Sequence, residues 1–200
     1  MVATYRRGKR GKICGEKSMI LNLCSGDYPI AGAVNVDFMP LPKVDYVCDL
    51  TKIPWPWESN SIDKIYMYHA LEHFENHVAV LNECYRILKS GGLLEIIVPH
   101  SSSPVAVGCL GHYRTYSYDT LNYFLSNPNY LFPQKKFDTV YRELRWWSRR
   151  NDTKGPVRLV LIPLNFIINN LIKLSTKAFE NCWWGWVGGA REVLWIGRKV

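Results

Sequence analysis

Histidine and carboxylate side chains that could hold a metal ion are concentrated in one part of this chain. All five histidines lie between residues 69 and 112, and His69 and His73 are four residues apart with Glu72 between them. Side chains three and four residues apart meet on one face of a helix. Two imidazoles and a carboxylate are suitable ligands for a divalent cation with open coordination positions. The spacing therefore predicts a metal site around Glu72.

Polar residues also follow five apolar segments, at the point where each predicted strand ends. These strands are expected at residues 19–24, 33–37, 44–49, 62–68 and 93–98, and the polar ends are Cys24–Asp27, Asp37, Asp49, His69 and His100. In a parallel sheet the carboxyl ends of the strands meet at one edge, where ligands bind. Five such ends in succession favour a nucleotide-type cofactor site over five unrelated turns.

The elements that must position these residues indicate an α/β fold. A helix is expected over 72–89, because Val78, Leu81, Tyr85 and Leu88 share one face, with Gly91–Gly92 as its cap and His77 on its solvated side. Ser117 is expected to cap a later helix. Segments 137–147 and 191–199 are predicted to pair antiparallel. The alternation predicts a Rossmann-like, mostly parallel central sheet with an antiparallel late strand and flanking helices.

Length and charge predict one domain with a basic arm. The chain has 200 residues and a formal net charge of +8. Residues 1–18 hold six Lys or Arg against Glu16 alone, so we expect an arm there, a single domain over 19–200, and an insertion on the acceptor side at about 101–190. The arm is expected to be solvated; the alternative is that it contacts phosphates.

Cysteine spacing and hydropathy predict a cytoplasmic protein without a transmembrane segment. The six cysteines form no C-x-x-C pair, which argues against a zinc finger or a redox motif. No apolar segment of the signal-peptide kind follows the basic arm. Residues 157–174 are the most apolar stretch, but Asn and Pro interrupt them and they are short for a bilayer span. A buried helix is expected there, with peripheral membrane contact as the alternative.

Several motifs together resemble one family. The segments LNLCSGD, NVD, CDLTKIPWPWESNSID, YHALEHF and LNECYRILKSGG resemble the class I S-adenosylmethionine (SAM) methyltransferases over residues 19–120. The resemblance implies that Gly26 lies at the methionine end of SAM, that Asp37 binds the ribose hydroxyls, and that Asp49 binds the adenine. The cofactor-binding residues that it implies are Asn22, Cys24, Ser25, Gly26, Asp37, Phe38, Asp49, Leu50, Tyr68 and His69.

The chain departs from this family pattern in two ways. Cys24 and Tyr28 stand where the family has glycines. Only nine residues, 25–33, join the first two predicted strands. A helical crossover needs about a dozen residues or more, so the first helix is expected to be reduced to a turn.

A second resemblance concerns the metal site. Metal-dependent methyltransferases of small-RNA 3′ ends and of ubiquinone catechols carry E-x-x-E-H with a further histidine downstream. This chain is similar, with His69-x-x-Glu72-His73 and Gly111-His112-Tyr113. The resemblance implies Mg or Mn held by His69, Glu72, His73 and His112, with a vicinal diol bound to the metal. The alternative is metal-free catalysis, in which His69, His100 or His112 is the general base.

The lead prediction for the acceptor is a sugar hydroxyl of a glycan or nucleotide sugar. The segment YHALEH differs from the N-P-P-Y signature of amino-group methyltransferases, which favours oxygen as the target. Similar proteins take part in polysaccharide assembly, so the chain is also expected to be a module of a larger glycan-assembly protein. Tyr113, Arg114 and Tyr116 are expected to line the acceptor pocket, and Trp146, Trp147, Trp183, Trp184 and Trp186 to stack on sugar faces.

Three other functions stay open from the sequence. The basic arm and the segment 135–158, with a net charge of +5, fit a nucleic-acid (ribose 2′-O) methyltransferase. A small-molecule O-methyltransferase is a further alternative. A binding module without catalytic activity is the last, and Cys24 in place of glycine is its only support.

Overall fold

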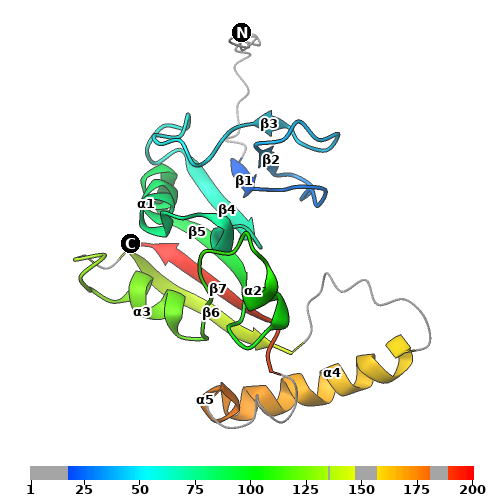
Figure 1. Cartoon of the computed structure of the whole chain (residues 1–200). Helices are drawn as coiled ribbons and strands as arrows, with labels where there is room; N and C mark the ends of the chain where they lie inside the picture. The colour runs from blue at the N-terminus through cyan, green and yellow to red at the C-terminus, as the bar shows by residue number, and fades with distance from the viewer. Residues whose placement is uncertain (1–17, 135, 147–156, 181–188) are drawn as a thin grey trace.

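The computed structural model describes residues 18–134, 136–146, 157–180 and 189–200 (Figure 1). The described strands form one seven-stranded sheet in the order β3-β2-β1-β4-β5-β7-β6. Strands β1 to β5 pair in parallel, and β7 runs antiparallel to both β5 and β6. This topology confirms the predicted Rossmann-like sheet with an antiparallel late strand.

The strand positions agree well with the sequence. The strands are β1 Ile20–Leu23, β2 Val34–Asp37, β3 Tyr46–Val47, β4 Ile62–Tyr68, β5 Leu88–Pro99, β6 Phe137–Arg145 and β7 Glu192–Lys199. The helices are the 3-10 turn η1 Leu71–His73, α1 His77–Ile87, α2 Pro104–Gly108, α3 Thr120–Ser126, α4 Val157–Leu174 and α5 Thr176–Ala178. Only β5 begins far from its expected start, because the chain enters it directly from α1.

One face of the sheet carries the hydrophobic core. Leu21 and Leu23 of β1 and Ile65 and Met67 of β4 are fully buried, and the buried residues of α1 belong to the same cluster. Side chains alternate between the two faces of a strand, so the residues between these point to the other face. On that other face, Lys64 Nζ lies 2.8 Å from the Glu95 carboxylate of β5, so this part of the face is polar.

The predicted helix over 72–89 was wrong at both ends. Leu71–His73 forms only a 3-10 turn, Phe74 is extended, and α1 begins after Asn76. The Asn76 side chain accepts the Ala79 backbone N–H at 3.0 Å, so this residue caps the helix. The expected Gly91–Gly92 cap was also wrong, because both glycines lie within β5. Gly91 takes a φ of 77° there, a left-handed conformation that suits glycine.

The predicted cap of α3 also differs from the structure. The N-cap residue, which directly precedes the helix, is Asp119 and not Ser117. The Asp119 side chain makes no capping hydrogen bond. The Ser117 hydroxyl contacts the Thr120 hydroxyl at 3.0 Å instead. Ser117 therefore shapes the turn that leads into α3.

The connections around β1, β2 and β3 contain no helix. Residues 24–33, 38–45 and 48–61 form only turns and extended segments, and the first of these confirms the shortened crossover. An asparagine holds two of the loops together. The Asn35 side chain accepts Asn22 Nδ2 at 2.9 Å and the Ile30 N–H at 2.8 Å, and it donates to Asp45 at 2.8 Å. In a sheet with crossover helices, packing of the helices would hold such loops in place. Here the hydrogen bonds of Asn35 do so.

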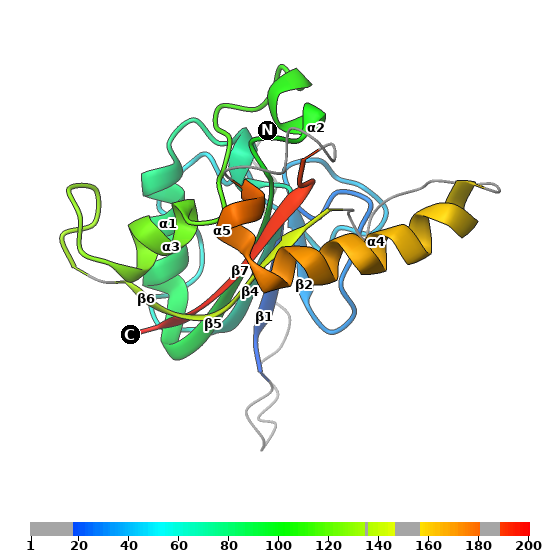
Figure 2. The same cartoon turned by 90° about the horizontal axis from the view of Figure 1, so that it is seen from below.

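The apolar helix α4 forms as predicted, but it is not buried. Ile162, Phe166, Ile167 and Leu174 have exposed fractions of 51, 71, 54 and 82%. Figures 1 and 2 show α4 beside the β6 end of the sheet, with its N-terminal end projecting away from the body. No helix within the described ranges combines the length and hydropathy that a bilayer crossing requires.

Candidate functional site

The loop after β1 forms a cradle at the carboxyl edge of the sheet. Cys24 and Gly26 take φ values of 54° and 50°, and a Cβ atom on Gly26 would meet nothing within 4 Å. The Asp37 carboxylate accepts the Gly26 N–H at 2.9 Å and the Met39 N–H at 3.0 Å. The Ser25 hydroxyl is buried and has no hydrogen-bond partner among the described residues. Open space beside Gly26 and an unpartnered polar atom fit a ligand with polar groups such as SAM.

The other predicted cofactor residues lie around this cradle with different exposures. Phe38 follows Asp37 and is 66% exposed, so its ring is free to stack on an adenine. Asn22 is buried and donates to the Tyr28 carbonyl at 3.1 Å, which holds the loop in shape. Asp49 accepts the Thr51 N–H at 3.1 Å, and the Leu50 carbonyl accepts Trp55 Nε1 at 3.0 Å. Asn22 and Leu50 therefore support the loops from within.

Tyr68 was expected to close over the sulfonium of SAM. It is the last residue of β4, and its hydroxyl hydrogen-bonds the Glu95 carboxylate of β5. Burial and the hydrogen bond to Glu95 raise the pKa of the hydroxyl. The Tyr68 hydroxyl is therefore engaged in a hydrogen bond within the sheet.

Cys24 stands where the family pattern has glycine, and it adopts the left-handed conformation that favours glycine. Burial raises the pKa of its thiol to about 12, and the charges of Asp37 and Glu72 add to the effect. A thiol with this pKa stays protonated near pH 7, which makes it a poor nucleophile. The influence of both carboxylates shows that the cradle adjoins Glu72.

Glu72, His73 and His112 form the group that is suited to a metal ion. One ligand atom from each residue lies within 4.8 Å of the others. The backbone explains how distant segments meet, because the Tyr113 N–H donates to the Glu72 carbonyl at 2.9 Å. The rings of His73 and His112 pack edge to face, with centroids 4.6 Å apart.

Backbone contacts orient both imidazoles of this group. His73 Nδ1 lies 3.0 Å from the Gly111 carbonyl, and His112 Nδ1 lies 3.3 Å from the Ala106 carbonyl. A carbonyl only accepts, so each Nδ1 carries the proton in these contacts. Each Nε2 then presents a lone pair, which can bind a cation or take up a proton.

The Glu72 carboxylate is the least satisfied group in this part of the structure. Its exposed fraction is 1%, and neither oxygen accepts a hydrogen bond from the described residues. The nearest cation is His69, whose Nδ1 lies 3.6 Å from Oε1. A buried carboxylate without hydrogen bonds is costly, so its environment favours a cation beside it.

The structure places His69 outside the metal-binding group, contrary to the predicted ligand set. Its Nε2 lies 3.1 Å from the Glu192 carboxylate of β7. Desolvation lowers the pKa of this imidazole, but the hydrogen bond to Glu192 and the charges of Glu72 and Glu192 outweigh it and raise the pKa to about 9. A protonated imidazole between two carboxylates cannot donate a lone pair to a metal ion or act as a base.

The structure also separates His100 from the group. His100 is 1% exposed, with Nδ1 2.7 Å from the Ser102 hydroxyl and Nε2 2.9 Å from the Glu180 carboxylate. Both ring nitrogens are therefore engaged. His100 joins the end of β5 to the segment after α5, and its predicted role as a base has no support from its position.

A cavity of about 720 Å³ lies between α1 and α3. Leu81, Leu121 and Phe124 are apolar residues of its lining, and Arg114 and Tyr116, which the sequence suggested for the acceptor pocket, also line it. Tyr113 contributes its backbone to the Glu72 contact, and its side chain is 59% exposed. The cavity has the size and mixed lining of a small-molecule site.

His77 is a candidate functional residue that the sequence did not reveal. It lines the cavity, its Nε2 is buried without a hydrogen-bond partner, and the same holds for the Tyr116 hydroxyl. Burial lowers the pKa of His77, so the ring is neutral near pH 7. The helix was expected to begin five residues earlier, which hid the position of His77 on the first turn. Two unpartnered polar atoms in one cavity point to a polar ligand group.

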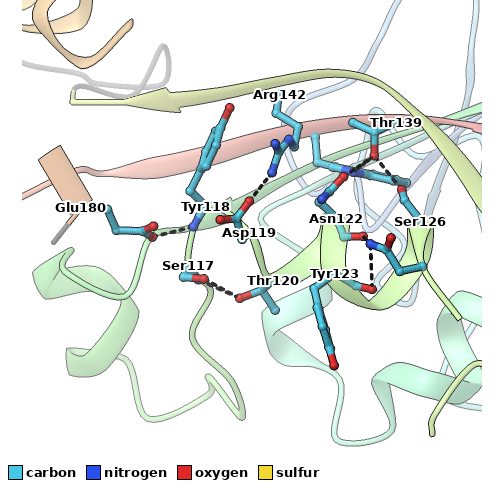
Figure 3. Close-up of polar contacts among 12 residues, drawn as sticks. Ser117, Tyr118, Asp119, Thr120, Asn122, Tyr123, Ser126, Thr139, Arg142 and Glu180 are labelled. Atoms are coloured by element: carbon cyan, nitrogen blue, oxygen red, sulfur yellow. Dashed lines mark hydrogen bonds and ion pairs between the residues drawn. The ribbon is translucent and has the colours of Figure 1, made fainter. Parts of the chain in front are cut away.

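Helix α3, which forms one wall of the cavity, is fixed to β6 by polar contacts (Figure 3). Asp119 pairs with Arg142, and the Thr139 hydroxyl donates to Asn122 at 2.8 Å. The Glu180 carboxylate accepts the Tyr118 N–H at 2.7 Å at the start of the same segment. These contacts hold α3 in place against β6.

The basic and Trp-rich segments contribute little to this site. Lys136 lies 4.5 Å above the Tyr85 ring, Arg142 lies 4.4 Å above the Tyr118 ring, and Arg145 bonds to Glu143 at 2.7 Å. Trp146 is half-buried and packs against the core. The other four predicted tryptophans, the arm up to residue 17, Lys135 and residues 147–156 lie outside the described residues.

Comparison with known proteins agrees with the sheet order. Residues 29–96, which begin after Gly26 of the cradle loop, match a family described as a methyltransferase domain. Over this segment the chain is similar to that family. Among solved structures, it is similar to a SAM-dependent methyltransferase from Archaeoglobus fulgidus, with 17% identity over 92% of this chain and 87% of that chain, and a TM-score of 0.58.

Other structures show how far the likeness extends. A SAM-dependent methyltransferase from Mesorhizobium loti shares 14% identity over 93% of this chain and 94% of that chain, with a TM-score of 0.52. The cyclase SpnF shares 15% identity over 91% and 75%, with a TM-score of 0.53. A search of curated protein sequences gave no match. At these identities the structures show the fold of the methyltransferase domain, and the acceptor must be argued from the site.

Proposed function

We propose that this methyltransferase transfers the SAM methyl group to a sugar hydroxyl of a glycan or nucleotide sugar. The observation that carries the proposal is the group of Glu72, His73 and His112. It lies near both the cradle and the cavity, since the charge of Glu72 acts on Cys24 of the cradle and on Tyr116 of the cavity lining. An alcohol loses its proton only at high pH, so methylation of oxygen requires a base or a Lewis acid at the acceptor. Two Nε2 lone pairs and a buried carboxylate supply one or the other.

The residues present fit a divalent cation such as Mg or Mn. Glu72, His73 and His112 would hold it, because Glu72 lacks hydrogen-bond partners and both histidines are oriented through Nδ1. When bound, a divalent cation lowers the pKa of a coordinated hydroxyl, and SAM presents an electrophilic methyl group. Three protein ligands leave positions open for two neighbouring hydroxyls of one sugar.

The chain's own residues then position the reactants. Asp37 and the turn at Gly26 hold the cofactor at the end of β1, and the cavity between α1 and α3 receives the acceptor. His77 and Tyr116 bind its polar groups at one end, and Arg114 adds a positive charge there. The oxygen gains the methyl group, and the sulfur keeps the bonding pair as S-adenosylhomocysteine. The hydroxyl proton passes to water or, if no cation is held by His112, to His112 Nε2.

Two features of the site support a sugar over RNA. Described cations of the basic segment are engaged within the molecule, since Lys136, Arg142 and Arg145 contact Tyr85, Tyr118 and Glu143 respectively. The cavity combines aromatic and aliphatic surface with a few polar groups, as sites for small polar ligands with apolar faces do. We also propose that the enzyme acts in the cytoplasm, because Cys24, Cys48, Cys84 and Cys109 are free thiols.

The test is methyl transfer from labelled SAM to matched acceptors. A deoxyhexose-terminated oligosaccharide with a vicinal diol, the same oligosaccharide with one of these hydroxyls removed, and a short RNA are each incubated with and without chelator. The proposal predicts label in the intact diol only, loss of label with chelator, and recovery when Mg or Mn is added back. Label in RNA, or equal label in the diol and the deoxy acceptor, contradicts it.

Transfer to the sugar that persists with chelator would separate the two parts of the proposal, the sugar acceptor and the divalent cation. In that case the acceptor is right and the metal is wrong, and His112 or His73 acts as the base. Recovery of transfer when Mg or Mn is added back is expected only if the metal part of the proposal is right.

A further inference from the structure

Helix α4 has its polar and apolar sides reversed relative to a helix that packs on a core. The side that faces the protein carries Asn165, Ile168, Asn169 and Ile172, which recur at the spacing of one helix face. Ile172 is 1% exposed and the other three are half-buried. The outer side carries Ile162, Leu164, Phe166, Ile167, Leu171 and Leu174, each 38% exposed or more. Two asparagines thus face inward, while six large apolar side chains face out. One asparagine, Asn170, is also exposed, and its amide donates to the Phe166 carbonyl at 2.8 Å.

Polar contacts hold the helix in this orientation. Asn169 Oδ1 accepts the Trp146 N–H at 3.0 Å, and Asn169 Nδ2 donates to Asn165 Oδ1 at 2.7 Å. After α5, Phe179 is buried, and Glu180 bonds to His100 and the Tyr118 N–H. Because both the middle of α4 and the segment after α5 are bonded to the body, the apolar side cannot turn inward without breaking these contacts.

The charges on α4 and α5 have one sign. Residues 157–178 contain Arg158, Lys173 and Lys177 and no acidic residue. Lys173 comes seven residues after Phe166, so both lie on the same line of the helix surface. Lys173 and Lys177 are exposed. The outer side therefore combines a broad apolar surface with cations.

We propose that α4 docks in the plane of an anionic lipid bilayer, with Phe166, Ile167 and Leu171 among the acyl chains and Lys173 at the headgroups. A helix of this kind lies in the interface when its apolar face is buried in the headgroup and acyl boundary, and cations bind the negative surface. This docking is independent of the proposed acceptor, and it agrees with the lack of a spanning helix among the described residues.

The charges favour a bilayer over a second copy of the chain. A two-fold dimer through α4 would bring the same apolar surface of each copy together. Lys173 would then lie at an interface where it loses water, and residues 157–178 offer no acidic side chain to pair with it. At a bilayer the long Lys173 side chain extends to the headgroups while its methylene groups stay among apolar chains.

The test is cosedimentation of the full chain with vesicles of phosphatidylcholine, with or without phosphatidylglycerol. The expected result is binding to the anionic vesicles that weakens as salt is raised. The double variant Phe166→Ser and Ile167→Ser should bind at least about tenfold more weakly, because two apolar side chains no longer enter the bilayer. Lys173→Glu should weaken binding to anionic vesicles alone.

The matched control is Tyr123→Ser on α3, which also replaces an exposed ring on a helix, here 55% exposed. It should bind vesicles as the wild type does. All variants alter exposed side chains, and unchanged melting temperatures will show that they fold. Wild-type protein that stays in solution, or a double variant that binds normally, overturns the proposal. Dimerisation in ultracentrifugation that the double variant abolishes, without vesicle binding, overturns it in favour of a second copy.

Discussion

At the scale of single residues, the chemistry depends on how three side chains are partnered. Glu72 is buried without a hydrogen bond, while His73 and His112 are each oriented by a backbone carbonyl. His69 lies beside them but is paired with Glu192. His69 differs from His73 and His112 because both of its ring nitrogens face carboxylates, Nδ1 at 3.6 Å from Glu72 and Nε2 at 3.1 Å from Glu192.

Substitution of His112 tests this assignment. His112→Ala should lower turnover by about 100-fold or more, because it removes a ligand or the base. It should also weaken Mn binding, measured by calorimetry, while SAM affinity stays within a factor of about two. Asn82→Ala, at an exposed position on α1, is the control. Normal turnover and normal Mn affinity in His112→Ala would rule out the cluster as the reaction centre.

The sequence predicted part of this site for a physical reason. Glu72 and His73 are neighbours on one turn, and Asp37 ends an apolar strand. The local spacing of residues therefore predicts the positions of all three. The exclusion of His69 depends on Glu192, which is 123 residues away, and no local pattern reveals such a contact. His77 was missed for a similar reason, since its role depends on where Asn76 starts α1.

At the scale of elements, asparagine side chains replace helix packing around β1 and β2. Asn35 accepts from Asn22 and from the Ile30 N–H, and it donates to Asp45. The strands were predicted because their apolar periodicity is local. The loops were not predicted in detail, because this network joins residues that are far apart along the chain.

Asn35→Ala should destabilise the protein by about 2 to 3 kcal/mol, because several buried hydrogen bonds lose their partner. Urea unfolding measures this change, and SAM affinity should fall with it because the Asn22 and Ile30 segments flank the cradle. Asn82→Ala, at an exposed position on α1, is again the control. Unchanged stability in Asn35→Ala would show that the loops are held in another way.

The Glu83 carboxylate ties α1 to the segment before β4. It accepts the Trp55 N–H at 2.8 Å and two Arg86 nitrogens at 2.8 and 2.7 Å. The Arg86 hydrogen bonds lower the pKa of Glu83, desolvation opposes them, and the Trp55 N–H adds to the lowering. A lowered pKa in the folded state means that Glu83 stabilises the protein above its ordinary pKa and loses this effect as pH falls through the folded value.

Glu83→Gln should therefore lower the free energy of unfolding by about 2 kcal/mol at pH 7. The difference from wild type should shrink as pH falls through the lowered folded-state pKa, because the wild-type carboxyl then also becomes protonated. Urea unfolding across the acid range checks both parts. A constant difference at every pH would show that shape, and not charge, accounts for the effect.

At the scale of the whole molecule, the described residues divide into a cofactor edge, an acceptor cavity and an outward-facing helix. The cradle lies at the ends of β1 and β2, the cavity lies between α1 and α3, and α4 lies beside the β6 end of the sheet (Figures 1 and 2). The mostly parallel sheet with its antiparallel late strands followed from the alternation of elements. The exposure of α4 did not, because hydropathy alone does not distinguish a helix buried in a core from one that faces lipid.

The central claim is that a sheet whose first crossovers have lost their helices still binds SAM at Asp37. Calorimetric titration of the full chain with SAM tests it most directly, with Asp37→Asn and the exposed control Asp27→Asn alongside. We predict one SAM per chain, binding at least about tenfold weaker in Asp37→Asn because a charged acceptor of the ribose hydroxyls is lost, and normal binding in Asp27→Asn. A folded wild-type protein that binds no SAM, or an Asp37→Asn variant with full affinity, would contradict the account.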